Sequence, residues 1–493
     1  MKRLFMLLSL IIAALVIVAC EADNGTIYGL IYEERTHEER PYEDAHEKLY
    51  EELHYEDELH EAKYEYVEIE GIKRRIMPQG SLTVEHFLED LAYMVYVLEN
   101  NFALLDVARW AHGVDYRELA ANAREAVVAM EELCEGIFMA LVHFHFYPLM
   151  ITGHFDIFTP TSYDWGISNF YGGYRGRKAR MNLELMRSPL AYRFYGSPGA
   201  RSGFYEGRRQ VLGYEPTYNR IMGYFPGGMS EPLHTGVVTE IIEEGRIAYI
   251  FTGANMQVLR QQQSAIFNFY RQISDFEHLI IDVRGNLGGN ADVFLNVIVR
   301  PTLTEAVEAP YVFQFFQDGP YVRRFGDMLF LSTTSSGYLT NLEEYRTARE
   351  VLSSNDLPEF NLADIERLDY GARSGRVSPL THPSTMVSTE YAFSGKIWLL
   401  TDHTMMSAAQ LAAWYSMELG FATRVGETTG GALGGPRTLA FMPNTGIIFY
   451  FDIFYITDSR GRPLEAGTIP HYFNREGMDA LETVLAMIEE GAY

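Results

Sequence analysis

The chain has 493 residues, enough for two or three domains, and its 47% apolar content is ordinary for a folded protein, so wholesale disorder is excluded. The formal net charge of −26 argues against nucleic acid as a partner and against attraction to an anionic membrane surface. Much of that charge lies in residues 21–70, which hold 18 Asp and Glu against 4 Lys and Arg.

The first 20 residues predict a targeting segment. Lys2 and Arg3 precede an apolar run, and Ile17-Val-Ala-Cys20 resembles a bacterial lipobox, in which the cysteine is lipidated and becomes the mature N-terminus. A simple transmembrane anchor is the alternative, but the run is near the short limit for spanning a bilayer. We therefore expect a lipoprotein signal peptide over residues 1–20, a lipid anchor at Cys20 and an extracytoplasmic body at a bacterial cell membrane.

An acidic tether is expected over residues 21–75. This stretch is rich in Glu, Tyr and His, so it repels itself and buries little apolar surface. Its histidines lie among carboxylates but lack the close spacing of metal ligands, so no metal site is predicted.

Residues 76–150 predict an N-terminal helical subdomain. Phe87, Leu91, Met94 and Leu98 recur at three- and four-residue steps, and further helices are expected at residues 116–130 and 133–142. Residues 151–235 carry many aromatic residues and glycines with little helical period, so a β-rich middle region of short strands and loops is expected.

From residue 236 to 493 the pattern alternates between strands and helices, which predicts an α/β core. Strands are expected at residues 248–251, 279–283, 396–400, 422–425 and 447–454. Helices are expected at residues 259–273, at 291–299 and directly after Ser407, and residues 301–390 are expected to form a long insertion.

Ser407 stands where an apolar strand turns into a helix. A hydroxyl at this place lies beside backbone N–H groups that stabilise a developing negative charge, as acyl transfer requires. An N-cap serine is the commoner reason for a serine at a helix start, so the local pattern alone favours a cap.

A glycine-rich turn changes this interpretation. Asp282-Val-Arg-Gly-Asn-Leu-Gly-Gly289, Ser407-Ala-Ala-Gln410 and Val425-Gly-Glu-Thr-Thr429 together resemble the signatures of the serine peptidase family that contains the carboxyl-terminal (tail-specific) processing proteases and the tricorn protease core. Gln410 stands where that family usually has glutamate. The resemblance implies the spiral β/α fold shared with the Clp protease and crotonase superfamily. Many relatives carry a PDZ domain, whose landmarks residues 151–235 lack.

The resemblance also implies a base for Ser407. The processing-protease branch uses a lysine in a Gly-Lys-Gly context, but Ala432 occupies that place and no lysine follows Lys396. The tricorn-like branch uses the histidine of an Asp-x-His step and a glutamate near the C-terminus. The matching step here is His143-Phe-His145, which makes His145 the predicted base.

Histidine suits this role because its pKa lies near operating pH. His143 and His403 remain alternatives to His145. Glu465 begins a segment, through His471, that resembles the family's Glu-x-x-Gly-Ile-x-Pro-Asp, so it is the implied assisting glutamate. The implied oxyanion donors are the backbone amides of Ala408 and of Gly288 or Gly289.

The predicted function is a secreted, membrane-tethered serine endopeptidase of the tricorn-like branch. Ser407 attacks the peptide carbonyl, His145 takes the proton, and water releases the acyl-enzyme. The substrate is a peptide or protein, and neither a metal nor an organic cofactor is implied. The alternative, from a different functional class, is a catalytically inactive ligand- or peptide-binding module on the same fold, as in the retinoid-binding relatives.

Overall fold

The computed structural model describes residues 66–69, 72–78, 80–172, 177–212, 236–253, 256–302, 311–323, 345–374, 393–433 and 437–493. The predicted lipobox with Cys20 and most of the predicted tether lie outside these residues. The end of the tether is described as an antiparallel hairpin of β1 (Tyr66–Ile69) and β2 (Ile72–Arg75). Of the helices described, none is long and apolar enough to cross a membrane.

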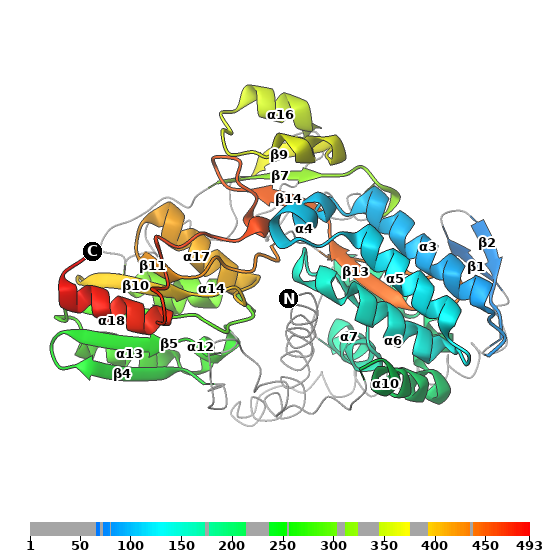
Figure 1. Ribbon diagram of the computed structural model, residues 1–493, viewed down its shortest axis with the longest axis horizontal. Coiled ribbons are helices and arrows are strands. Elements are labelled where there is room, and N and C mark those ends of the chain that lie inside the picture. Colours follow the sequence, from blue (N-terminus) through cyan, green and yellow to red (C-terminus); the bar gives the residue numbers. More distant parts are fainter. Residues whose placement is uncertain are drawn as a thin grey trace, which may run out of the picture.

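The N-terminal helical subdomain is confirmed, and it extends beyond residue 150. Its elements are α3 (Val84–Asn101), α4 (Leu105–His112), α5 (Tyr116–Ala129), α6 (Glu135–Phe146), η1 (Tyr147–Ile151), β3 (Asp156–Ile157), α7 (Pro160–Gly172), α8 (Arg177–Met186), α9 (Pro189–Tyr195) and α10 (Pro198–Leu212). Figure 1 shows these helices gathered at one end of the molecule.

The prediction of a β-rich middle region over residues 151–235 is wrong for the part that the structure describes, which is mainly α7 to α10. The glycines in it serve close helix packing. A Cβ on Gly207 of α10 would lie 2.9 Å from the Cβ of Ala140, and one on Gly136 of α6 would lie 2.3 Å from the carbonyl oxygen of Ala200. Glycine therefore lets α10 and α6 approach at backbone distance.

The predicted α/β core is confirmed by a six-stranded sheet of order β15-β11-β10-β6-β5-β4. Its strands are β4 (Val238–Glu243), β5 (Ile247–Phe251), β6 (His278–Asp282), β10 (Lys396–Thr401), β11 (Thr423–Gly426) and β15 (Tyr472–Phe473). β4 is antiparallel to β5, and the other neighbours are parallel. Leu400 pairs with Asp282, so the carboxyl ends of β10 and β6 lie at the same edge of the sheet.

Helices cover both faces of this sheet, which explains why its central strands are apolar throughout. The helical elements of the core are α12 (Gln257–Gln261), α13 (Gln263–Gln272), α14 (Ala291–Phe294), η2 (Leu295–Val299), η3 (Arg300–Thr302), α17 (Ala408–Leu419) and α18 (Ala480–Glu490). Met487 of α18 packs with Trp398 and Val425 on one face, while Leu279 and Leu399 belong to the main core on the other.

The strand expected at residues 447–454 is two strands that belong to different sheets. β13 (Ile448–Asp452) pairs with β12 (Arg437–Phe441) and β3, whereas β14 (Phe454–Thr457) joins β7 (Val312–Phe316), β9 (Tyr370–Ser374) and β8 (Arg346–Thr347). The described part of the insertion also holds α16 (Ala348–Ser354) and η5 (Leu362–Arg367). In Figure 1 the insertion lies above the junction of the core and the helical subdomain. η7 (Leu464–Ala466) follows β14.

Candidate active site

Ser407 lies at a strained turn between β10 and α17. Its φ of 55° and ψ of −120° are unusual for a residue other than glycine. Its N–H donates to the carbonyl oxygen of Gly431 at 3.0 Å. Ser407 occupies the N-cap position of α17, but its side chain makes no capping hydrogen bond. The strained backbone and the lack of a capping bond fit a nucleophile elbow better than a capping serine.

The glycine-rich turn after β6 packs directly against this elbow. A Cβ built on Gly288 would lie 2.8 Å from the Cβ of Ser407 and 3.0 Å from the backbone nitrogen of Ala408, so only glycine fits. The two loops are also joined by the N–H of Gly285, which donates to Oδ2 of Asp402 at 3.0 Å. The turn of residue 288 and the elbow of residue 407 are thus in direct contact.

The two glycines of this turn differ as candidate oxyanion donors. The N–H of Gly288 donates to Oδ1 of Asn286 at 2.9 Å, so this amide is already engaged. For the amides of Gly289 and Ala408, no acceptor is found in the described part of the chain. Because a Cβ built on Gly288 would lie 3.0 Å from the nitrogen of Ala408, these two amides come from adjacent segments. Gly289 and Ala408 are therefore the better pair.

Glu465, in η7, is buried beneath the loops that surround Ser407. Its Oε1 accepts from the N–H of Gly153 at 2.7 Å and of Ala432 at 3.1 Å, and its Oε2 accepts from the N–H of Leu433 at 2.8 Å. Burial raises the pKa of Glu465 to about 8, although the three N–H donors oppose this shift. The carboxyl group thus joins a loop of the helical subdomain to the loop of residues 431–433, whose Gly431 accepts a hydrogen bond from Ser407.

His154 is a histidine that the sequence interpretation missed. It directly follows Gly153, and its own φ is 46°. Its Nδ1 lies 2.6 Å from Oδ2 of Asp452, the last residue of β13. A signal was present in the sequence, because Thr152-Gly-His154 also fits the Asp-x-His step, with Thr152 in place of the aspartate.

Backbone strain is concentrated in this region. In the described part of the chain, His154, Ser407 and Ala432 are the residues other than glycine that have a positive φ. Three hydrogen bonds link them: Ser407 to Gly431, Ala432 to Glu465, and Glu465 to the residue before His154. Residues held in such conformations gather at functional sites, where the surrounding structure enforces them.

The other candidate histidines lie differently. His145 is in the last turn of α6, next to the ring of Phe144, and burial lowers its pKa. Among the described residues, no hydrogen bond, ion pair or ring contact connects His145 with Ser407 or Glu465. His143 is buried, and burial lowers its pKa to about 3. His403 Nδ1 lies 2.5 Å from Oε2 of Glu427, which raises the pKa of His403.

Lys396 lies at the opposite end of β10 from Ser407. Its Nζ sits 4.9 Å from the ring centroid of Trp398 and 4.6 Å from that of Tyr493. A Ser-Lys pair between Lys396 and Ser407 is therefore not formed.

Gln410, which replaces the glutamate usual in the family, holds η7 by hydrogen bonds of its side-chain amide. Its Nε2 donates to the carbonyl oxygen of Leu464 at 3.0 Å and contacts Oγ1 of Thr468 at 3.1 Å, and its Oε1 accepts from the hydroxyl of Thr429. The amide therefore satisfies acceptors and donors that a carboxylate would meet only in part. Among the described residues, no group of three or more His, Cys, Asp or Glu is arranged to hold a metal ion.

Comparison with known proteins finds a sequence match over the core. The sequence model of peptidase family S41 matches residues 246–473, and no curated protein matches the chain. Mature CPAF is similar in structure, at 14% identity and a TM-score of 0.44, over 83% of this chain and 98% of that chain. The photosystem II D1 C-terminal processing protease shares 14% identity at a TM-score of 0.27, over 49% and 46% of the two chains. The tricorn protease shares 16% identity at a TM-score of 0.26, over 50% and 18%.

The structural similarities are low, so the assignment rests on the matched sequence. That sequence contains the glycine-rich turn, the elbow with Ser407, Asp452 and Glu465. The segment of residues 246–473 therefore matches peptidase family S41 in sequence.

Proposed function

We propose that this chain is a serine endopeptidase in which Ser407 is the nucleophile and His154 the general base. The observation that carries the proposal is the hydrogen-bonded series that links Ser407, Ala432 and His154, three residues in strained conformations, through Glu465. A packing role would not require residues so distant in sequence to share one strained region. His145 has no comparable connection, so we assign the base role to His154 instead.

The hydrogen bond to Asp452 suits His154 for proton transfer. A carboxylate that accepts from Nδ1–H fixes the tautomer, so that Nε2 is the nitrogen that can take a proton. The Ser407 hydroxyl gives its proton to Nε2 as its oxygen bonds to the substrate carbonyl carbon. The amides of Gly289 and Ala408 receive the resulting oxyanion. Nε2 then protonates the leaving amine, and water hydrolyses the acyl-enzyme by the same route.

Glu465 has a supporting role in this scheme. With a pKa of about 8, it is mostly protonated at neutral pH, which suits it poorly as the carboxylate partner of a histidine. Its three backbone contacts instead hold the loops of residues 153 and 432–433 in place. Asp452 is therefore the orienting carboxylate, and Glu465 supports the backbone on both sides of the site.

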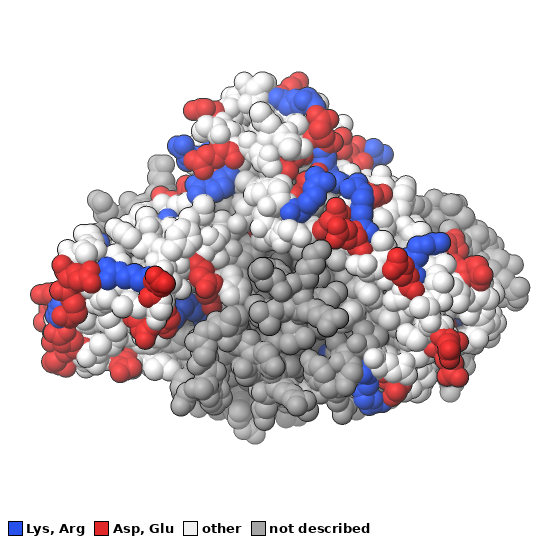
Figure 2. Space-filling view, viewed as in Figure 1, with Lys and Arg blue, Asp and Glu red and all other residues white. Residues whose placement is uncertain are grey.

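We place the enzyme outside the cytoplasm, held at a bacterial membrane by a lipid on Cys20, because residues 17–20 have the lipobox pattern. The substrate is a peptide or protein. Nucleic acid is not expected as a partner, since the chain carries a net charge of −26. On the face shown in Figure 2, basic and acidic side chains are intermixed over the described surface, which also does not suit a polyanion.

Casein digestion tests the proposal. The wild-type chain should cleave casein, and Ser407→Ala should leave no cleavage above background. Casein and a random peptide library left intact by the wild-type chain, but bound by it, would indicate an inactive binding module on the same fold.

A further inference from the structure

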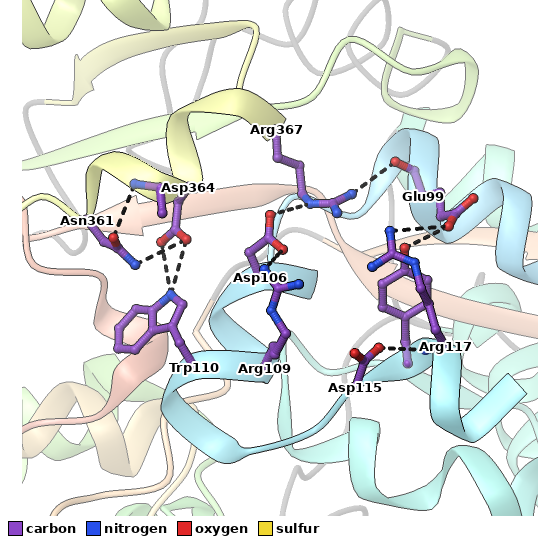
Figure 3. Close-up of polar contacts among 11 residues, drawn as sticks. Glu99, Asp106, Arg109, Trp110, Asp115, Arg117, Asn361, Asp364 and Arg367 are labelled. Carbon is purple, nitrogen blue, oxygen red and sulfur yellow. Dashed lines mark hydrogen bonds and ion pairs between the residues drawn. The ribbon is translucent and has the colours of Figure 1, made fainter.

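Helix α4 of the helical subdomain and η5 of the insertion lie side by side, joined by two polar contacts (Figure 3). Nε1 of Trp110 donates to both carboxylate oxygens of Asp364, at 3.1 and 3.2 Å. Nε of Arg367 donates to Oδ2 of Asp106 at 3.0 Å. The partners are four residues apart on α4 and three apart on η5, so each pair lies on one face of its helix. These contacts fix α4 against η5.

Asp364 is the buried member of this interface, with 1% of its surface exposed. Besides Trp110, it accepts a hydrogen bond from the hydroxyl of Tyr455 in β14, at 2.7 Å. Its carboxylate therefore joins α4 of the helical subdomain to η5 and to β14, the core strand that pairs with the insertion strand β7. A buried carboxylate is costly to leave without donors, so the positions of both neighbours depend on it.

The contact of Asp364 with Trp110 is connected to Glu465 through helix α4. His112 is the last residue of α4, two residues after Trp110, or about 3 Å of helix rise. Its Nε2 lies 3.1 Å from the carbonyl oxygen of Glu465, so it donates to that carbonyl. An eight-residue helix is marginal by itself, so the place of His112 is set by what α4 packs against.

The contact of Asp364 with Tyr455 is connected to Asp452 through the chain between β13 and β14. Tyr455 follows Asp452 by three residues, or about 10 Å of extended chain. Ile453, between the two strands, is buried, and Asp452 ends β13 while Tyr455 lies in β14. Holding the hydroxyl of Tyr455 therefore fixes the end of β13, where Asp452 meets His154.

We propose that Asp364, in the insertion, is a positioning residue for the active site, because it holds Trp110 and Tyr455 and so sets Glu465 and Asp452 relative to each other. This inference rests on the proposed function. It also gives the insertion a role, since the insertion contacts both the helical subdomain and the core, and the carboxyl group of Asp364 fixes their spacing. A displacement of about 1 Å at reacting groups can lower a rate up to a hundredfold.

The test measures how fast a fluorophosphonate probe labels Ser407, as a maximal rate constant and a binding constant. Asp364→Ala removes the hydrogen bonds to both Trp110 and Tyr455. Trp110→Phe removes only the first, on the side of Glu465. Tyr455→Phe removes only the second, on the side of Asp452. Trp110 is 45% exposed, so its replacement should leave the fold intact. Arg349→Ala is the matched control, because Arg349 pairs with Glu366 of η5 at the surface.

A positioning role predicts a maximal labelling rate about tenfold lower for Asp364→Ala, with the binding constant and the folded fraction unchanged. Asp364→Asn, which keeps one acceptor oxygen, should lie between wild type and Asp364→Ala. Tyr455→Phe should shift the midpoint of the rate against pH, since it acts through the partner of His154, whereas Trp110→Phe should not. Arg349→Ala should label at the wild-type rate.

Folded Asp364→Ala and Trp110→Phe chains that label at the wild-type rate would overturn the inference while the proposed function stands. A loss of rate that only follows the unfolded fraction, measured by thermal melting, would overturn it as well. A wild-type chain that the probe does not label would overturn the proposed function and this inference with it.

Discussion

The imidazole of His154 and the carboxylate of Asp452 form a hydrogen bond of 2.6 Å between Nδ1 and Oδ2. The backbone strengthens this pairing, because the N–H of Asp452 donates to the carbonyl oxygen of Gly153 at 2.8 Å. Neighbouring Gly153 also donates to Glu465. The histidine is thus held from two sides, which is what a general base needs in order to act repeatedly in one geometry.

The choice of base is tested by replacing two histidines separately. His154→Ala should lower casein cleavage by about a hundredfold or more, since positioned general bases contribute on that scale. His145→Ala should change it little. The opposite ranking in the same assay would restore His145 as the base.

The close approach of the glycine-rich turn to the elbow predicts a large effect of one methyl group. In Gly288→Ala the new Cβ would meet the Cβ of Ser407 at 2.8 Å and the φ of 105° would be strained. We expect a loss of about 1–3 kcal/mol of stability together with loss of cleavage.

Gly245→Ala is the matched control for this change. Gly245 also has a positive φ, of 70°, but a Cβ there meets nothing within 4 Å. It should lower stability by about 1 kcal/mol and leave cleavage unchanged. Equal cleavage by the two variants would mean that the contact of residue 288 with Ser407 has no part in activity.

Glu465 makes stability depend on pH. Its pKa is raised from 4.5 to about 8 by burial, so the folded chain holds this proton more tightly than the unfolded chain. The resulting stabilisation is complete below pH 4.5 and is lost as the pH rises through about 8. In that window the free energy of unfolding should fall by up to about 1.4 kcal/mol per pH unit.

Glu465→Gln should flatten this slope in urea unfolding experiments between pH 5 and 8. Burial also raises the pKa of Asp90 to about 6 and of Asp156 to about 7, but both groups are present in the two chains, so their contributions cancel in the difference. Parallel curves for the wild type and the variant would show that Glu465 ionises normally in the folded chain.

Anchoring is tested at Cys20. Because the proposed lipid is attached to this thiol, Cys20→Ser should move the protein from the membrane fraction to the soluble extracytoplasmic fraction, or leave its signal peptide uncleaved. Radiolabelled palmitate should mark the wild type alone. Equal labelling of both chains would end the lipoprotein interpretation.

The core could be predicted from sequence because its signals are local. The apolar runs of β6 and β10 are each buried on both faces, and the turns that follow them carry the motif residues themselves. For this reason the sequence pattern alone could place the two motifs at the ends of core strands. Helices α3 and α5 were also predicted, because their apolar residues recur with helical period.

The helices of the middle region were missed because their sequence suits a loop as well as a helix. Pro189 and Pro198 stand at helix starts, and Ser188 caps α9, which are genuine start signals. The many glycines of this segment are typical of loops, but Gly136 of α6 and Gly207 of α10 have a tertiary role, because they let the two helices approach each other closely. The sequence of residues 151–235 does not show that α6 is the helix against which α10 packs.

His154 was missed for a related reason. His145 and His154 lie nine residues apart, and the sequence does not say which of them meets residues about 300 positions later. The position of β13 decides this, because its last residue, Asp452, binds His154 and not His145. Long-range contacts of this kind are set by the whole fold, so they became visible only in three dimensions.

The central claim is that Ser407 is a reactive nucleophile, and a covalent probe tests it most directly. The chain would be treated with a fluorophosphonate, and the intact mass and the peptide map would be measured. We predict one adduct per chain, located on Ser407, with none on Ser407→Ala and a strongly slowed reaction in His154→Ala. A folded wild-type chain without an adduct, or with the adduct on another serine, would contradict the claim.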